Sequence, residues 1–437
     1  MLDLLPPEIF ARVLEIAIES WGIGFLPPIC RVSSTCRDVV LSTPSLWGII
    51  SIDKHSSLPP LKLQLAKAKE TDLRITFSHK GWSKNSTNKY TQRLMDCLTP
   101  LAHNWVRLDL PTILLALARS ADMGRLGALS LRLISVTDTS SADTFFGQDG
   151  TQSTPPNLHS FTASALPEEW TTRFLSPRIT FFEIGRLRNI PAATIERYLS
   201  RTPNVHTLNL LKLNLLPLSA LNTPLTLSNL HNLDVTEVEG LMPLLLDIRA
   251  PSLRTLAIRD CTGEMGPVFS QWSQQSHLPA ALQRLELAHC LNADDTPFLI
   301  RWLARLPALL RLTLAHAHAD ELPWAAASAS VETDLLCALA SPHGAGPVVG
   351  GWLCPALRHL YLDVPLSLAD LLPLARARGP RSEARPRGPG APAALSSIQA
   401  HLCCSGTADE LAELRSYFAE AEDVWCLCVG CSFNLKI

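Results

Sequence analysis

Charged residues are scarce in this chain of 437 residues, and their two signs nearly cancel. Lys, Arg, Asp and Glu together make up 18% of the residues, and the formal net charge is -2. This balance gives no global attraction to nucleic acid or to an anionic membrane surface. Because hydrophobic residues make up 47% of the chain, wholesale disorder is excluded and a folded protein is expected.

Long apolar runs and a secretory leader are also missing. Residues Met1 to Glu8 contain neither the basic segment nor the apolar segment of a signal peptide. No stretch of about 18 apolar residues is free of charges and helix breakers, so no membrane span is expected. We therefore expect the 12 Cys residues to be reduced thiols and the protein to be cytoplasmic, nuclear or both.

Catalytic and metal-binding motifs are absent as well. The sequence has no phosphate-binding Gly loop, no G-x-S-x-G elbow and no H-E-x-x-H helix. Two groups have metal-like composition, but neither completes a zinc-binding pattern: His316, His318 and Asp320, and then Cys403, Cys404, Cys426, Cys428 and Cys431. We therefore predict a protein that is not an enzyme and that holds no metal and no cofactor.

The first fifty residues are predicted to form a small helical unit. Pro6 and Pro7, followed by Glu8, are typical of a helix N-terminus. Apolar residues then recur at helical spacing up to Ala17, and a second helical pattern runs through residues 26–40. A unit of about 45 residues is near the lower size limit for independent stability, so it is expected to lean on a neighbour or a partner.

The same residues resemble an F-box, in particular that of fungal F-box proteins. The resemblance is carried by Leu5-Pro6-Pro7-Glu8-Ile9, by Cys36-Arg37 and by Ser42-Thr43-Pro44-Ser45-Leu46-Trp47. In that family the motif binds the Skp adaptor of a cullin-based ubiquitin ligase. The resemblance implies an adaptor-binding set of Leu5, Pro6, Ile9, Leu14, Ile29, Val32, Cys36, Arg37 and Trp47. Helical spacing alone would equally fit a plain helical hairpin with these residues as its core.

A repeated pattern fills the rest of the chain. Its template is L-x-x-L-x-L-x-x-(Cys, Asn or aliphatic), and the copies begin at Trp105, Leu126, Leu158, Ile179, Val205, Leu230, Leu253, Leu282, Leu309, Leu357 and Leu395. From Ile179 to Leu309 the copies begin 26, 25, 23, 29 and 27 residues apart, which is the period range of leucine-rich repeats. Helical patterns, such as residues 294–306, often separate the copies.

The resemblance implies an F-box over residues 1–50, and the repeated pattern predicts an α/β solenoid over residues 51–437. The expected fold is a horseshoe like that of leucine-rich repeats, with short parallel strands and with helices outside. Beyond the template we expect strands at residues 49–52 and 73–77, and helices at 58–70 and 325–340. The Arg-, Gly- and Pro-rich residues 376–392 are predicted to be a disordered surface loop.

The parity of the template predicts which side chains are buried. The fourth and sixth positions point to one side of a strand, into the core, and the third, fifth and seventh point away. Cys261, Cys290 and Cys403 fall at the ninth position, where we assign them to structure rather than chemistry. The exposed positions of the later copies are rich in Arg, Tyr and acids, and Arg and Tyr are favoured at interfaces. They predict a partner site of Arg259, Arg284, Glu286, Arg311, His359, Tyr361 and Asp363.

Two functions fit these predictions. The first is a substrate receptor of an SCF-type (Skp, cullin, F-box) ubiquitin ligase, which binds the Skp-type adaptor, through it a cullin, and an unknown target protein. The second is a repeat scaffold that binds proteins without assembling into a ligase. In that case the first fifty residues are only a cap on the repeats. The alternative for the predicted partner residues is that they belong to an ordinary solvated sheet face. Neither function involves nucleic acid or a membrane.

Overall fold

The structure is a computed structural model in which the chain divides into two compact units, unit 1 (Met1–Leu187) and unit 2 (Arg188–Ile437). It describes residues 5–53, 55–78, 89–112, 114, 123–132, 155–216, 225–274, 281–315, 325–343, 351–383, 391–402 and 407–418. Both units are α/β, with parallel strands and with helices between them. No helix of these described ranges is long and apolar enough to cross a membrane.

Unit 1 begins with short helices that we call the N-terminal helical segment (residues 5–47). They are α1 (Pro7–Trp21), the 3-10 helix η2 (Ile23–Phe25), α2 (Leu26–Ile29), α3 (Ser34–Ser42) and α4 (Pro44–Trp47). The second predicted helix is therefore divided, because the Ser33 side chain accepts a hydrogen bond from the Cys36 N–H at 3.0 Å and starts a new helix there. Gly22 ends α1 with a φ of 80°, a backbone angle that favours glycine.

The rest of unit 1 is a parallel sheet whose strands pair in chain order. The strands are β1 (Ile49–Ile52), β2 (Leu73–Phe77), β3 (Trp105–Pro111), β4 (Ala128–Arg132), β5 (Ser160–Ser164) and β6 (Phe181–Gly185). The connecting helices are α5 (Leu58–Ala68), α6 (Lys89–Leu98), the 3-10 helix η4 (Thr99–Asn104) and α8 (Glu168–Phe174). The predicted strands at 49–52 and 73–77 and the helix at 58–70 are confirmed.

Unit 2 contains a second run of parallel strands, in the order β8, β10, β12, β13, β14, β17 and β18. Their bounds are β8 (Thr207–Leu216), β10 (Asn232–Glu239), β12 (Thr255–Arg259), β13 (Arg284–Ala288), β14 (Arg311–Ala315), β17 (His359–Leu366) and β18 (Ser397–Leu402). The short strand β7 (Ile190–Pro191) pairs with β8. Two separate two-stranded sheets are formed by β9 (Leu225–Thr226) with β11 (Ile248–Arg249), which are parallel, and by β15 (Pro342–His343) with β16 (Gly351–Trp352), which are antiparallel.

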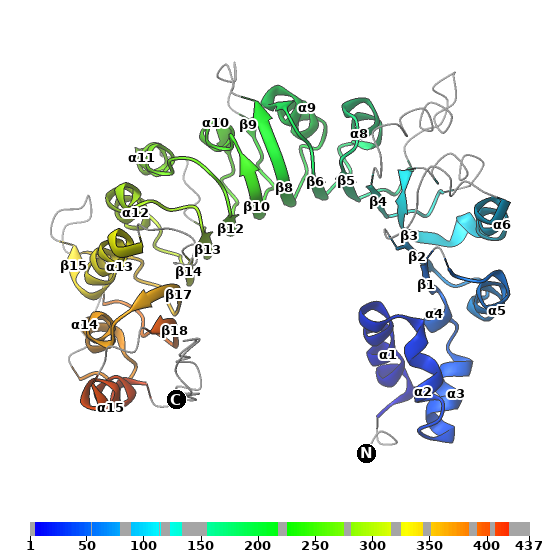
Figure 1. Cartoon of the computed structure of the whole chain (residues 1–437), viewed down its shortest axis with the longest axis horizontal. Coiled ribbons are helices and arrows are strands. Elements are labelled where there is room, and N and C mark those ends of the chain that lie inside the picture. Colours follow the sequence, from blue (N-terminus) through cyan, green and yellow to red (C-terminus); the bar gives the residue numbers. More distant parts are fainter. Residues whose placement is uncertain are drawn as a thin grey trace. The chain divides into compact units, whose positions relative to one another are not determined.

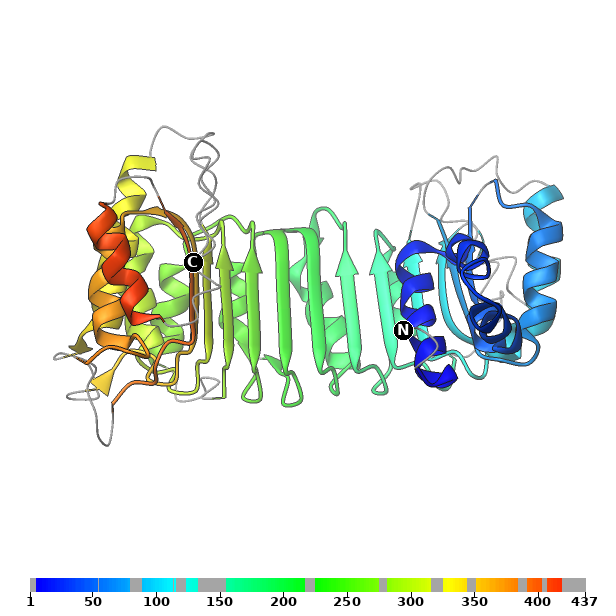
Figure 2. The ribbon, with the colours of Figure 1, turned by 90° about the horizontal axis from the view of Figure 1, so that it is seen from below.

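Helices cover one face of the unit 2 strands and leave the other face open (Figures 1 and 2). They are α9 (Ala192–Arg201), α10 (Met242–Asp247), α11 (Gly266–Gln274), the 3-10 helix η7 (Ala293–Asp295), α12 (Thr296–Leu303), α13 (Ala325–Ala340), α14 (Leu368–Arg378) and α15 (Ala408–Tyr417). The predicted helix at 325–340 is confirmed, and α12 confirms the one within 294–306. Figure 2 looks onto the open face, with the strands side by side and the helices behind them.

The template residues form the core of both units. In the copy that begins at Leu253, for example, Leu256 and Ile258 are buried on the helix side, while Thr255 and Arg259 are partly exposed on the other. The first residue of every copy is buried as well. The prediction is confirmed for the fourth and sixth positions, which are buried in the core. It is wrong for Ala257 at the fifth position and for Ala288 and Ala315 at the seventh, which are buried although we expected them to be exposed.

A left-handed backbone conformation recurs at one template position, directly after β5, β6, β12 and β13 and within β8 and β10. This eighth template position is Ala165, Arg186, Lys212, Glu237, Asp260 and His289 in six successive copies, with φ between 52° and 58°. None of them is glycine, so each carries a conformational cost of about 1 kcal/mol. This backbone conformation therefore repeats together with the hydrophobic pattern, whether or not the strand continues beyond it.

The predicted disordered loop at 376–392 is wrong at its start. Residues 376–378 form the end of α14, which begins with a capping box at Ser367 and Asp370. Arg378 is fully buried, and its Nη1 donates to the carbonyl of Cys354 at 3.0 Å. Burial lowers the pKa of Arg378 to about 10. Because this pKa is still well above 7, the guanidinium remains charged at neutral pH. Residues 384–390 lie outside the described ranges.

Candidate interaction surfaces

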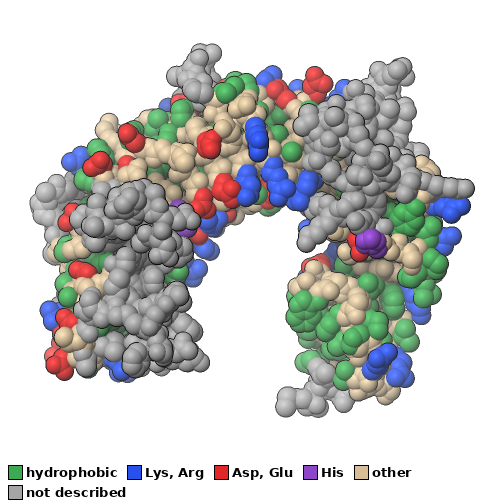
Figure 3. Space-filling view, viewed as in Figure 1, with side chains coloured by type: hydrophobic (Ala, Val, Ile, Leu, Met, Phe, Trp, Pro, Cys, Tyr) green, Lys and Arg blue, Asp and Glu red, His purple; other side chains and the backbone are tan. Residues whose placement is uncertain are grey.

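Exposed hydrophobic side chains gather on the N-terminal helical segment. Seven of the ten large hydrophobic residues that are exposed in the described ranges belong to it: Leu5, Ile9, Val13, Ile16, Trp21, Val32 and Leu41. The remaining three are Leu63, Leu216 and Leu310. Figure 3 shows the resulting green surface over α1 to α4. Single exposed hydrophobic residues are ordinary, but a patch of them on so small a segment marks an interaction site.

Helix α1 carries two separate apolar stripes. Phe10, Leu14 and Ile18, spaced four residues apart, are buried against α2, α3 and α4. Ile9 and Val13 form a second stripe with Ile16 and are 53% and 50% exposed. A helix that is apolar on two sides has two faces to bury, and in the described chain only one of them is covered.

The predicted adaptor-binding residues divide between this surface and the core beneath it. Five of them are exposed: Leu5, Pro6, Ile9, Val32 and Arg37. Ile29 and Trp47 are half-buried, and the Trp47 indole N–H donates to the Val40 carbonyl at 2.9 Å.

Two of these predictions need correction. Leu14 and Cys36 are each only 2% exposed, in the core of the N-terminal helical segment, so neither can touch a partner in this conformation. Leu14 lies inside because it shares a stripe with Phe10 and Ile18. The adaptor-binding set predicted from the sequence did not include the exposed residues Val13, Ile16, Trp21 and Leu41. The signal that could have found the first two is the second stripe of α1, which starts at Ile9.

The predicted partner residues of unit 2 stand on its open sheet face. In register, Arg284 pairs with Arg311, and Arg311 with His359. Glu286 pairs with Thr313, which pairs with Tyr361, and these positions are partly exposed. The structure thus brings together residues from β12, β13, β14 and β17. Asp363 belongs to β17, but its side chain lies outside the description.

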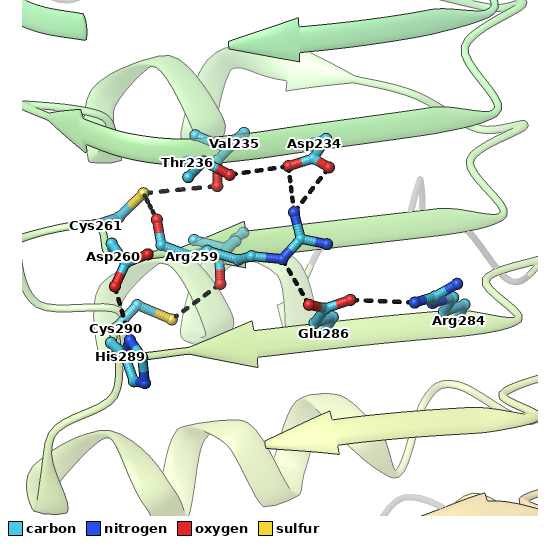
Figure 4. A network of polar contacts seen from close by, with 11 residues as sticks. Asp234, Val235, Thr236, Arg259, Asp260, Cys261, Arg284, Glu286, His289 and Cys290 are labelled. Atoms are coloured by element: carbon cyan, nitrogen blue, oxygen red, sulfur yellow. Dashed lines mark hydrogen bonds and ion pairs between the residues drawn. The ribbon is translucent and has the colours of Figure 1, made fainter. Parts of the chain in front are cut away.

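Arg259 is the centre of an ion-pair network on this face (Figure 4). Its Nε donates to Glu286 Oε1 at 2.5 Å, and its Nη1 donates to Asp234 Oδ1 and Oδ2 at 2.9 and 2.8 Å. Arg284 Nη2 reaches Glu286 Oε2 at 3.3 Å. The hydrogen bond from Arg259 lowers the pKa of Glu286 below its usual value, and the same bond raises the pKa of Arg259. Arg259 and Glu286 are therefore already paired within the chain.

The other predicted partner residues differ in whether their side chains already have a hydrogen-bond or ion-pair partner within the chain. His359 Nδ1 lies 2.9 Å from the Ser397 hydroxyl. Arg311 is exposed, and its side chain has no hydrogen-bond or ion-pair partner among the described residues. The open face thus combines a neutral, self-satisfied network with an arginine that is available to a partner.

The cysteines of the template are structural, as predicted for those described. The Cys261 thiol donates to the Arg259 carbonyl at 3.2 Å, and the Cys290 thiol to the Ile258 carbonyl at 3.6 Å. Burial raises the pKa of both thiols, which makes them poor nucleophiles. Among the described residues, no cluster of His, Cys, Asp and Glu could hold a metal ion. Cys403, Cys404, the Cys426–Cys431 group and His316, His318 and Asp320 lie outside the described ranges.

Comparison with known proteins adds no relative. No family model matches this chain, and no curated protein is significantly similar to it. Two surfaces of the described chain therefore point to its function. One is the exposed hydrophobic surface of the N-terminal helical segment, and the other is the polar open face of unit 2.

Proposed function

We propose that this chain is the substrate-recognition subunit of an SCF-type ubiquitin ligase. The N-terminal helical segment is an F-box that binds a Skp-type adaptor and, through it, a cullin. The repeats are of the leucine-rich type, and their open face binds the target protein. The observation that carries the proposal is the exposed apolar surface of the N-terminal helical segment, together with its resemblance to the F-box.

A partner on this surface would stabilise a segment that has little core of its own. Ile9, Val13 and Ile16 are each about half exposed, between 50% and 55%. Because full burial of such a side chain contributes about 1.5–3 kcal/mol, covering the exposed half contributes about 1 kcal/mol for each. Several such contacts supply the hydrophobic centre that a specific interface needs.

A subunit of this kind does no covalent chemistry. It holds a target beside the ligase, which raises the local concentration of target lysines near the activated ubiquitin. The open sheet face supports such a role, since it presents polar side chains from several adjacent strands on one surface.

The alternative is a repeat scaffold in which the N-terminal helical segment only caps the sheet. Contacts within unit 1 favour it: Gln64 Nε2 donates to the carbonyls of Trp47 and Ile49 at 3.1 and 2.9 Å, and Arg74 pairs with Glu19. A terminal cap, however, needs a polar outer face to remain soluble. The exposed surface here carries seven large hydrophobic side chains among its charged ones, which supports the ligase subunit over the cap.

A pulldown with a purified Skp-type adaptor tests the proposal. The full chain is compared with Ile9→Asp/Val13→Asp, and the matched control is Leu216→Asp/Leu310→Asp, which changes two exposed leucines of unit 2. We expect binding by the unaltered chain and the control but not by the α1 variant, with circular dichroism showing that all three are folded.

Two results would contradict the proposal. If the α1 variant bound as well as the control, the apolar surface would not be the adaptor site. If the folded, unaltered chain did not bind the adaptor at all, the scaffold would be the remaining function.

A further inference from the structure

Four arginines follow the edge of the unit 2 sheet at which its strands begin. Arg284 and Arg311 are the first residues of β13 and β14, while Arg254 and Arg358 immediately precede β12 and β17. Because these strands are parallel and neighbours in the sheet, the four arginines lie at the same edge of consecutive strands. Arg284 and Arg311 are register partners at the third template position, and Arg254 and Arg358 lie one residue earlier, at the second. All four are exposed.

The positive charge of this arginine row is not balanced by the residues around it. Arg284 belongs to the Arg259 network, in which two arginines face the carboxylates of Asp234 and Glu286. The side chains of Arg254, Arg311 and Arg358 have no hydrogen-bond or ion-pair partner among the residues that the structure describes. The network is formally neutral, so three unpaired positive charges remain in the row.

The geometry of the row fits an extended chain that crosses the strands. Neighbouring strands lie about 4.8 Å apart, so the row spans about 14 Å from β12 to β17. An extended peptide rises about 3.3 Å per residue, so four or five of its residues cover that length. Acidic side chains at every second position would all face the row, within reach of long arginine side chains.

We propose that the arginine row binds an acidic, extended segment of the target protein. The inference rests on the proposed function, because it takes the open face as the target site, and it adds the chemistry of what is bound. Arginine suits this role because its planar guanidinium matches a carboxylate in a two-point contact.

A nucleic acid is the less suitable polyanion. Single-stranded nucleic acid is held by aromatic side chains on which its bases stack, together with basic residues. The second and third template positions of these four copies are Arg254, Thr255, Gln283, Arg284, Leu310, Arg311, Arg358 and His359, with no Phe, Tyr or Trp. The row therefore offers charge without a stacking platform.

Fluorescence anisotropy with the full chain tests the inference. The probe is a labelled peptide of about ten residues in which Glu alternates with Gly, and its partner probe has Gln in place of Glu. We expect the Glu peptide to bind, the Gln peptide not to bind, and binding to weaken between about 50 mM and 300 mM salt as the charges are screened.

Charge-reversal variants locate the site. Arg311→Glu/Arg358→Glu is expected to weaken binding about tenfold or more, because two attractive pairs become repulsive. The matched control, Arg301→Glu/Arg415→Glu, makes the same change in net charge on exposed residues of α12 and α15 and is expected to change affinity less than about twofold. A milder Arg311→Gln/Arg358→Gln variant confirms the effect without introducing repulsion.

Three outcomes would overturn the inference. They are no binding of the Glu peptide, equal losses in both charge-reversal variants, and tighter binding of a single-stranded RNA of equal charge. The experiment contains no adaptor, so its result is independent of adaptor binding. A chain that fails to bind the adaptor can still bind the acidic peptide, and the reverse also holds.

Discussion

Replacing Arg259 by Ala is expected to loosen the centre of the unit 2 sheet. Arg259 makes three charge-assisted hydrogen bonds to two carboxylates, and its side chain is 31% exposed. A hydrogen bond to a charged group contributes about 1.5–3 kcal/mol when buried, and an exposed ion pair at most about 1 kcal/mol. At this intermediate exposure we expect a loss of about 2 kcal/mol, which raises local opening about thirtyfold.

Hydrogen exchange is the suitable assay, because a repeat array need not unfold in one step. The amides of β10, β12 and β13 report the free energy of local opening. Arg254→Ala is the matched control, since Arg254 precedes the same strand and is exposed, and its side chain has no partner among the described residues. It is expected to change the opening free energy by less than about 0.5 kcal/mol.

The pH dependence follows from Glu286. Its folded pKa is lowered, first of all by the hydrogen bond from Arg259. A carboxylate with a lowered pKa adds stability above its unfolded value of about 4.3, and that stability is lost as the pH falls through the folded pKa. The difference between the unaltered chain and Arg259→Ala is therefore expected to narrow below about pH 4.3.

Two results would refute this reasoning. One is exchange in Arg259→Ala that stays within about twofold of the unaltered chain. The other is a double-mutant cycle of Arg259→Ala with Glu286→Gln whose coupling energy is zero, because residues in direct contact are expected to couple by about 0.5–3 kcal/mol.

Two further predictions concern the repeat backbone and the thiols. Ala165 has a φ of 58°, so Ala165→Gly is expected to raise the unfolding free energy by up to about 1 kcal/mol in a urea titration. The control Ala163→Gly, in the preceding strand, is expected to lower the unfolding free energy. A lower unfolding free energy in Ala165→Gly would contradict the strain argument. Burial raises the pKa of Cys354 to about 12, whereas Cys337 is exposed. Alkylation at pH 8, mapped by mass spectrometry, is therefore expected to modify Cys337 rapidly and Cys354 only after unfolding. Equal labelling of the two thiols in the folded protein would refute this prediction.

The sequence by itself determined where the strands of the main sheet lie and which leucine-type template positions are buried, but not the short strands β7, β9, β11, β15 and β16. Spacing alone predicts that Leu253, Leu256 and Ile258 are buried, and they are. Side chains alternate along a strand, and every copy repeats the same alternation. The Ala-rich helix α13 was likewise predictable from its composition. These features depend on neighbours in the chain, and the sequence contains that information directly.

Only the tertiary structure decided which of several equivalent groups are used. The spacing of α1 shows two apolar stripes, but packing against α2, α3 and α4 puts Leu14 inside and leaves Ile9 outside. Composition makes Arg259 and Arg311 look alike. In the fold, however, the Arg259 side chain reaches carboxylates on both neighbouring strands, whereas the register partner of Arg311 is another arginine, Arg284. Such pairings depend on distances between residues that are about 25 positions or more apart in the chain, which no local pattern specifies.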